Sequence, residues 1–425
     1  MKTESSQLVD ALKLRVAVLT GGGDKPYAFG LVTELMRLKL RVDVIAGNEL
    51  DLPEFRNQPG VSFLNLRGDQ RPDASLLQKV LRVLIYYLKL IRYAATSKAD
   101  VFHILWNNKI QTFDRTLLMA YYKALGKRVV LTVHNVNAGK RDGNDGWLNR
   151  LTLRIQYHLA DHLFVHTDKM KQELWQDFAV PAARVSEIPF GINNSVPATD
   201  LTPAGARQKL GIGESERVIL FFGNIAPYKG LEYLVTAFWK LATKENGFRL
   251  VIAGRPKDCD AYWAPLHSSL QEGIRRGEII LKLEYVPDEE TEIYFKASDV
   301  LVLPYTHIYQ SGVLFLGHSF GLPVLASDVG SLKDDIVPGE TGLIFRPSDA
   351  DDLLRCLKEY FGSSLYRDLG RKRIEIREAV TKQHSWELVG QMTLAVYGQI
   401  LGVSGCGTVS NAKSAASSVG RNAHV

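Results

Sequence analysis

The chain has 425 residues, of which 46% are hydrophobic and 23% are charged, and this composition excludes a fibrous or largely disordered protein. The formal charge of +6 favours anionic partners such as phosphates, nucleic acid or acidic lipid, without choosing among them. The three cysteines are far apart, which argues against a disulfide scaffold and a Cys-x-x-Cys zinc site. No apolar run reaches the ~18 residues needed to span a bilayer, and the first 14 residues lack the apolar core of a signal peptide, so we expect a cytoplasmic protein.

The first half of the chain alternates between strand and helix patterns. An apolar run at 15–20 predicts a buried strand, which leads through a glycine loop containing Gly22 and Gly23 into a helix near residues 28–38. Further strands are expected at 42–47, 101–105, 128–133 and 162–165, and further helices near 116–125, 148–160 and 169–178. The glycine spacing is not Gly-x-Gly-x-x-Gly, so it does not indicate a nicotinamide cofactor, and we expect no cofactor.

Residues 78–93 form the most apolar helix candidate. Four basic side chains lie on one side of it at helical spacing, and aliphatic side chains cover the other. The basic residues are Lys79, Arg82, Lys89 and Arg92. Two interpretations stay open: a helix that lies on an anionic membrane surface, or a core helix with a solvated face. The first predicts a protein that is peripheral on the inner face of a membrane.

A polar loop is expected at 137–147. It contains several glycines together with Lys140 and Arg141, a composition typical of a mobile loop that binds substrate.

The second half begins after residues 195–217, which are rich in Pro, Thr and Gly and indicate a domain boundary. A second series of strands is expected at 218–222, 249–253, 279–283, 300–303, 324–327 and 343–345, with helices between most of them. Repeated βα units predict an α/β protein with parallel sheets covered on both faces.

The stretch 218–230 is the most informative part of the chain. An apolar strand pattern ends at Gly223, and a loop containing a proline then delivers Lys229 to the start of an amphipathic helix. Ligands of open α/β sheets lie beyond the carboxyl ends of the strands, where a lysine beside a helix N-terminus can neutralise a phosphate. The alternative is a surface lysine on an ordinary loop.

Several short motifs occur in an order that resembles family 4 retaining glycosyltransferases. They are Ile-Pro-Phe-Gly at 188–191, Phe-Gly at 222–223, Lys-Gly-Leu at 229–231, Val-Ile-Ala-Gly at 251–254, Ala-Ser-Asp-Val at 297–300, Pro-Tyr at 304–305, Phe-Gly-Leu-Pro-Val at 320–324 and Thr-Gly at 341–342. The resemblance covers most of residues 15–400.

The resemblance implies the GT-B fold, in which two Rossmann-like domains face each other across a cleft and the last helix crosses back to the first domain. The expected parts are an acceptor domain at 1–195, a nucleotide-sugar domain at 196–385, a crossing helix at 386–402 and a disordered tail at 403–425. The implied reaction moves a sugar from a nucleoside diphosphate to an acceptor hydroxyl with retained anomeric configuration and without a metal.

The resemblance also assigns roles to residues. Lys229 is expected on the diphosphate, and His134 on the transferred sugar. Other expected contacts are Gly22 and Gly23 near the donor phosphates and acceptor, Val286 near the base, Ser311, Gly312 and Val313 at a helix start that holds the phosphates, Asp334 in the place of a frequent family Glu, and Lys140 and Arg141 toward the acceptor.

Two departures from the family pattern stand out. Asn224 occupies the place of an arginine, which removes one charge from the diphosphate site, and Ile308 and Leu316 replace a pair of glutamates, the second of which normally holds the ribose. The Ser-Gly-Val sequence at 311–313 resembles a branch of bacterial exopolysaccharide enzymes. The expected partners are therefore a nucleotide-sugar donor and a sugar or lipid-linked acceptor, with an anionic membrane surface for the peripheral interpretation.

Other functions stay open. Asp258 and Asp260 have the Asp-x-Asp form that binds metals in a different glycosyltransferase fold, but a solvated loop is expected here and no metal. A GT-B epimerase or inverting transferase is the nearest alternative, and a catalytically inactive sugar-nucleotide-binding partner is the alternative outside enzymes. Nucleic-acid binding is not expected, because the basic residues are spread along the chain and no recognition motif is present.

Overall fold

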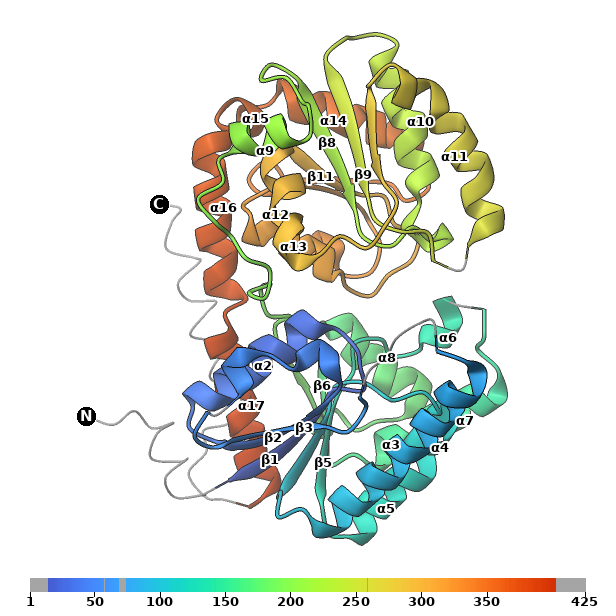
Figure 1. Cartoon of the computed structure of the whole chain (residues 1–425), viewed down its shortest axis with the longest axis vertical. Coiled ribbons are helices and arrows are strands. Elements are labelled where there is room, and N and C mark those ends of the chain that lie inside the picture. The colour runs from blue at the N-terminus through green and yellow to red at the C-terminus, as the bar shows by residue number, and fades with distance from the viewer. Residues whose placement is uncertain (1–13, 57, 69–73, 142, 258, 403–425) are drawn as a thin grey trace, which may run out of the picture. The chain divides into compact units, whose positions relative to one another are not determined.

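The computed structural model describes residues 14–56, 58–68, 74–141, 143–257 and 259–402. Its contacts divide the chain into two compact units, each built on its own sheet (Figure 1). Unit 1 comprises Met1–Gly191 and His384–Val425, and unit 2 comprises Ile192–Gln383. The predicted tail at 403–425 lies outside the described residues. The predicted domain limits and the ligand assigned to each domain stay predictions.

Unit 1 contains a seven-stranded parallel sheet with the order β3-β2-β1-β4-β5-β6-β7. The strands are β1 (Arg15–Leu19), β2 (Arg41–Ala46), β3 (Val61–Asn65), β4 (Val101–Ile104), β5 (Arg128–Thr132), β6 (His162–Val165) and β7 (Val185–Glu187). Most are short runs of aliphatic residues that are buried on both faces, as parallel strands under helices must be.

The helices of unit 1 connect these strands. They are α2 (Lys25–Arg37), α3 (Leu76–Thr96), α4 (Gln111–Phe113), the π-helical turn η3 (Asp114–Leu118), α5 (Met119–Ala124), α6 (Ala138–Arg141), α7 (Trp147–Leu159), α8 (Asp168–Phe178) and α17 (Trp386–Ile400), with short 3-10 turns at η1 (Asn48–Leu50), η2 (Pro53–Phe55) and η4 (Ala182–Arg184). Hydrogen bonds from side chains cap the first turns of two of these helices. At α2, Asp24 accepts from the Tyr27 backbone N–H, and at α3, Ser75 and Gln78 form a capping box.

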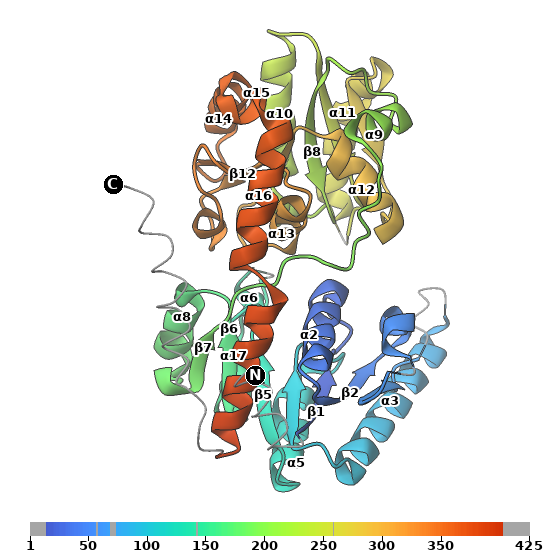
Figure 2. The same ribbon diagram turned by 90° about the vertical axis from the view of Figure 1, so that its left-hand side faces the viewer.

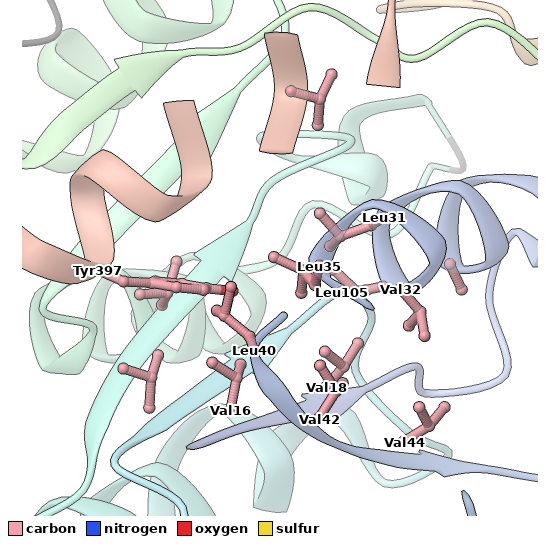
Figure 3. Close-up of a cluster of buried hydrophobic side chains, with 14 of the residues drawn as sticks. Val16, Val18, Leu31, Val32, Leu35, Leu40, Val42, Val44, Leu105 and Tyr397 are labelled. Atoms are coloured by element: carbon pink, nitrogen blue, oxygen red, sulfur yellow. The ribbon is translucent and has the colours of Figure 1, made fainter. Parts of the chain in front are cut away.

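The last helix, α17, completes the core of unit 1. It lies against the sheet (Figure 2), and its Tyr397 belongs to the same buried cluster as Val16 of β1 and Leu31 of α2 (Figure 3). The Trp386 ring sits where a Cβ on Gly30 would come within 2.0 Å, so only a glycine lets α2 approach it. Residues far apart in sequence therefore share one hydrophobic core.

Unit 2 contains a six-stranded parallel sheet with the order β10-β9-β8-β11-β12-β13. The strands are β8 (Arg217–Phe222), β9 (Phe248–Ala253), β10 (Ile279–Lys282), β11 (Val300–Leu303), β12 (Val324–Ser327) and β13 (Gly342–Phe345). The helices are α9 (Pro203–Lys209), α10 (Leu231–Ala242), α11 (Asp260–Arg275), α12 (Asp288–Ala297), α13 (Gly312–Ser319), α14 (Ala350–Gly362), α15 (Ser364–Arg367) and α16 (Leu369–Gln383), with 3-10 turns at η5 (Pro227–Lys229) and η6 (Leu332–Asp335).

Both sheets have the Rossmann strand order, with the first strand of the unit in the middle and the order reversing beside it. The reversal lies between β1 and β4 in unit 1 and between β8 and β11 in unit 2. The loops that leave these strands diverge to opposite sides of the sheet, and this is where α/β proteins bind ligands. The predicted α/β class and the two Rossmann-like units are confirmed.

The structure corrects the sequence-based elements in three places. The helix expected near 116–125 is broken, because its first part is the π-helical turn η3. Residues 195–217, for which no helix was predicted, contain helix α9, which packs on α12. Strands β3 and β7 and helix α16 were not predicted.

Candidate active site

In unit 2, Lys229 lies at the point where the strand order reverses. It ends the turn η5 after β8, is only 7% exposed, and its Nζ donates to the Tyr305 hydroxyl, 2.7 Å away, in the loop after β11. The close approach depends on Gly230, which has a φ of +63° and whose absent Cβ would lie 2.0 Å from the Pro304 carbonyl oxygen. Lys229 is therefore a buried cation at the carboxyl edge of the sheet and not the surface lysine of the alternative interpretation.

Tyr305 connects Lys229 to the start of helix α13. Its hydroxyl lies 3.3 Å from the Ser311 Oγ, and burial raises its pKa, so the phenol stays protonated. An ammonium group can only donate, so the Tyr305 oxygen accepts from Lys229 and its own proton points to Ser311. The hydroxyl proton of Ser311 is then left to donate to another group.

Ser311 is the N-cap of α13, but its side chain caps no backbone N–H. Gly312 and Val313 follow as the first helical residues and are partly exposed. Val313 also reaches Gly223, where a Cβ would lie 3.5 Å from its methyl group. The three residues predicted to hold phosphates therefore lie beside Lys229 in unit 2, at a helix end that favours negative charge.

Asn224, the residue in the place of the family arginine, is exposed just after β8. Ile225 forms a parallel bridge with Pro256, so Asn224 is level with Arg255 after the neighbouring strand β9. The Ile225 backbone N–H donates to the Arg255 carbonyl oxygen, 2.9 Å away, and the Arg255 side chain is exposed. Arg255 thus occupies the neighbouring register position to Asn224, where the family arginine is missing.

The remaining predicted contacts of unit 2 lie around the same edge. Val286 is buried in the loop after β10, and Leu316 is buried on α13, so no carboxylate replaces the family glutamate there. Asp334 is exposed, whereas its neighbour Asp335 lies 3.2 Å from the Gln310 Nε2, beside the start of α13. Burial raises the pKa of Asp335 to about 7.

In unit 1, the glycine loop also lies where the strand order reverses. A Cβ on Gly23 would lie 2.0 Å from the Trp106 ring, which follows β4, and one on Gly22 would lie 1.5 Å from the Arg67 guanidinium. Gly22 has a φ of +72° and is exposed to solvent. The two glycines let the loop pack against large side chains while its backbone stays accessible.

His134 follows β5 and is enclosed by aromatic side chains. Its ring stacks on Trp106, with centroids 4.0 Å apart and an interplanar angle of 3°, and the Tyr27 ring meets it edge-on at 4.7 Å. Burial, with His166 and His103 nearby, lowers its pKa well below the usual range, so the imidazole is neutral.

The hydrogen bonds of His134 fix its tautomer. The Ile188 carbonyl oxygen accepts from Nδ1 of His166 at 3.1 Å, so in a neutral ring the Nε2 of His166 is an acceptor. That nitrogen lies 3.1 Å from Nδ1 of His134, which must donate to it. Nε2 of His134 is then unprotonated and can accept a hydrogen bond. It is buried and has no hydrogen-bond partner among the described residues.

The described part of the loop predicted to contact the acceptor is held by several side-chain contacts. Asn137 is buried and donates to the Asp145 carboxylate at 2.7 Å, and α6 follows it. The Lys140 ammonium pairs with Asp177 at 2.6 Å and with Glu173 at 3.0 Å on α8, so neighbouring carboxylates balance its charge. The Arg141 side chain lies outside the described residues, and the acceptor role of both residues stays a prediction.

Within the described part of the chain, no group of three or more His, Cys, Asp or Glu side chains could hold a metal ion. Asp258 of the Asp-x-Asp sequence lies outside the described residues, and Asp260 begins α11. A membrane-crossing helix is likewise not found among the helices that the structure describes.

Sequence reasoning missed several residues that shape these sites. Tyr305 occurs in a recognised motif, but its link between Lys229 and Ser311 requires the β8 and β11 loops to meet. Trp106 and His166 lie in other βα loops, and only the strand order brings them to His134. Arg255 could have been found by counting along the β8–β9 register, since Asn224 and Arg255 follow their strands by the same number of residues.

Two family models match the chain and together cover most of it. The model described as "Glycosyltransferase Family 4" matches residues 21–196, and the model described as "Glycosyl transferases group 1" matches residues 216–362. An uncharacterized glycosyltransferase of Methanocaldococcus jannaschii is 25% identical over 391 residues, which are 88% of this chain and 94% of the relative. The D-inositol 3-phosphate glycosyltransferase of Kribbella flavida is 26% identical over 56% of each chain.

Solved structures show the same fold. HepE from Anabaena, solved with UDP and glucose, superposes with a TM-score of 0.70 at 16% identity, over 91% of this chain and all of that one. Sucrose-phosphate synthase from Thermosynechococcus elongatus gives a TM-score of 0.69 at 19% identity, over 92% of this chain and all of that one. The strand orders, the two family models and these relatives together identify the chain as a member of the family 4 glycosyltransferases with the GT-B fold.

Proposed function

We propose that this enzyme is a retaining, metal-independent hexosyltransferase that moves a sugar from a nucleoside-diphosphate sugar to an acceptor hydroxyl in polysaccharide or glycolipid synthesis. The observation that carries the proposal is the buried Lys229, held by Tyr305 beside the start of α13 at the carboxyl edge of unit 2. Family membership supports a nucleotide-sugar donor. HepE was solved with UDP and glucose, which makes a UDP-sugar the first donor to test.

Lys229 and Ser311 are proposed to stabilise the leaving diphosphate. Negative charge grows on its oxygens as the glycosidic bond breaks, and preorganised donors lower the barrier because they need not reorient. Lys229 supplies a fixed positive charge, Ser311 a hydroxyl proton, and Gly312 and Val313 backbone N–H groups at a helix end. Arg255 supplies the second charge that Asn224 lacks. Asp334 or Asp335 is proposed to meet a donor hydroxyl, and the Val286 backbone the base.

His134 is proposed to contact the transferred sugar. Its bare Nε2 accepts a hydrogen bond from a sugar hydroxyl, whereas a charged imidazolium would donate instead. Gly22 and Gly23 are proposed to bring backbone N–H groups close to the donor phosphates and acceptor. An epimerase or inverting transferase would give other products, so the anomeric configuration of the product decides among these reactions. An inactive partner would bind nucleotide without turnover.

A thermal-shift screen with UDP, GDP and ADP tests the donor site first, because a ligand that binds only the folded state raises the melting temperature. A shift with one diphosphate identifies the nucleotide. No shift with any of them contradicts the proposal.

Lys229→Ala is expected to lower the rate about a hundred- to a thousand-fold, the typical loss when one preorganised contact to the transition state is removed. Lys229→Met is the matched variant, because it keeps the side-chain volume beside Tyr305 while removing the charge. Activity should persist in EDTA and in the double variant Asp258→Ala with Asp260→Ala. Activity that a chelator abolishes and Mn or Mg restores, together with a nearly wild-type Lys229→Ala enzyme, would overturn the mechanism.

His134→Ala is expected to reduce turnover strongly while the dissociation constant for the nucleoside diphosphate stays nearly unchanged, since the ring meets the sugar and not the phosphates. Steady-state kinetics and calorimetric titration with the diphosphate separate the two effects. A large loss of nucleotide binding would instead assign His134 to the fold or to another subsite.

The buried histidines are expected to remain neutral between pH 8 and pH 5. Burial lowers the pKa of His103 to about 3 and that of His166 to about 4, so these rings take up protons only below this range, as does His134. In urea the same rings should titrate near 6.5. Nitrogen-15 NMR of histidine-labelled protein measures this, with His134→Ala assigning the signal. A His134 signal in the folded protein with a midpoint near pH 6.5 would exclude the bare Nε2 acceptor.

Peripheral membrane association through α3 is expected to depend on anionic lipid and to weaken with salt. Changing Lys79, Arg82, Lys89 and Arg92 together to Gln should reduce flotation with anionic liposomes. Equal flotation of this variant, or no flotation of the wild type with any liposome, would exclude the association.

A further inference from the structure

A pair of side chains in unit 2 lies just before the start of α13. Gln310 precedes the N-cap residue Ser311, and Asp335 ends the turn η6 in the loop after β12. The Gln310 Nε2 donates to the Asp335 Oδ2, 3.2 Å away. The Gln310 Oε1 is buried and accepts no hydrogen bond within the part of the chain that the structure describes. One end of this amide is therefore held by a carboxylate, and the other end is left without a donor.

The backbone that carries Gln310 is fixed. The Tyr309 carbonyl oxygen accepts two hydrogen bonds from Ser331, one from its backbone N–H at 3.0 Å and one from its Oγ at 2.9 Å. Gly330 permits this contact, because its φ is +60° and a Cβ there would lie 2.2 Å from the Ile308 carbonyl oxygen. The segment before α13 is thus tied to the segment that leads into η6, which is the support that a binding side chain needs.

The charge of Asp335 determines which way the amide faces. An ionised carboxylate can only accept hydrogen bonds, so the NH2 group of Gln310 faces it and the carbonyl oxygen faces away. Burial raises the pKa of Asp335 to about 7, so its carboxylate is ionised at pH 8. A buried amide oxygen without a donor costs free energy, and the last torsion of a glutamine side chain is soft. A small turn of the amide is therefore enough to present the oxygen to a ligand.

The amide oxygen requires a ligand that donates a hydrogen bond. A carbonyl oxygen only accepts, and so do the oxygens of an ionised diphosphate, so the two do not bind each other. The neighbouring Ser311 donates, and it ends the relay from Lys229 that is proposed for the diphosphate. Among residues 308–316, Gln310 is the one amide or carboxylate side chain. A nucleotide sugar carries hydroxyl groups on both sides of its diphosphate, and such a hydroxyl group fits the Gln310 oxygen.

We propose that Gln310 binds a hydroxyl group of the donor beside the diphosphate, and that Asp335 orients the amide for this contact. The inference rests on the proposed transferase function for the identity of the donor. Gln310 touches the ligand, whereas Asp335 acts through Gln310 and is a positioning residue. Of the two carboxylates considered for a direct contact with the donor, this leaves the exposed Asp334. The hydroxyl group belongs to the ribose or to the transferred sugar, and the test distinguishes the two.

Calorimetric titration at pH 8 with UDP and with UDP-glucose measures the contact. Gln310→Met keeps the length of the side chain and removes the amide. It should raise the dissociation constant for UDP-glucose about three- to tenfold, the usual contribution of one neutral hydrogen bond. Lys333→Gln is the matched control, because Lys333 is exposed on the same turn as Asp335 and pairs with Asp328. This control should bind both ligands as the wild type does.

Analogues that lack one hydroxyl group identify the group that donates. If it belongs to the ribose, Gln310→Met weakens UDP and UDP-glucose equally, and one deoxyribose analogue of UDP binds the wild type and the variant equally. If it belongs to the sugar, UDP binding is unchanged, and one deoxyglucose analogue of UDP-glucose shows no difference. Either result supports the contact. Equal binding of UDP and UDP-glucose to both proteins would overturn it, as would a loss that persists with every analogue.

Asp335→Asn tests the positioning role and also serves if Gln310→Met does not fold. Asparagine keeps the size of the side chain but lets the Gln310 amide face either way. The variant should therefore weaken the same ligands by a smaller factor, and the same analogue should abolish the difference. The two substitutions together should cost less than the product of their separate effects, because they act on one contact. Independent, multiplicative losses would remove the positioning role.

The wild-type titrations separate this inference from the proposed function. If the thermal-shift screen selects GDP or ADP, the same titrations use that nucleotide and its sugar. A wild type that binds none of the three diphosphates would overturn both the donor site and the Gln310 contact. A wild type whose binding depends on Lys229 but not on Gln310 would overturn the contact and leave the proposed function standing.

Discussion

The reversal of strand order in a parallel sheet is the constraint on which both candidate sites depend. Neighbouring βα loops normally leave the sheet on the same side, and only beside the first strand do they diverge and leave room for a ligand. In unit 2 this place is filled by Lys229 from one loop and Tyr305 from the other, and Gly230 permits their contact. In unit 1 the glycine loop meets Trp106 in the same way. The strand order therefore determines where the two candidate sites lie, whichever side chains the loops carry.

Two hydrogen-bond relays of opposite polarity follow from this placement. In unit 2 the relay starts at an ammonium group, which can only donate, and ends with a Ser311 hydroxyl whose proton points onward. In unit 1 it starts at the Ile188 carbonyl oxygen, which can only accept, and ends with a bare nitrogen on His134. The first suits phosphate oxygens and the second suits a sugar hydroxyl. Burial keeps both relays in one protonation state, because it lowers the pKa of the histidines and raises that of Tyr305.

The sequence was sufficient for elements whose pattern is local. Strand β11 is an uninterrupted apolar run, so its ends could be predicted to the residue. β3 and β7 were missed because one is only partly buried and the other has three residues. The positions of Lys229 and Ser311 beside a helix start could be predicted from the order strand, loop, helix. The partners Tyr305 and His166 could not, because each arrives from a different βα unit and only the strand order brings them together.

Helix α3 shows how a fold can leave an apolar face uncovered. Tyrosines hold its inner side as much as aliphatic packing does: Tyr86 donates to Asn108 at 2.5 Å and Tyr87 to Asp114 at 3.0 Å. These hydroxyl contacts, the capping box and the buried Leu90 hold the helix, so its exposed leucines are not needed for the core of unit 1. Exposed leucines in such numbers add nothing to the stability of a free monomer in water, and this is the physical reason for testing the membrane association proposed for this helix.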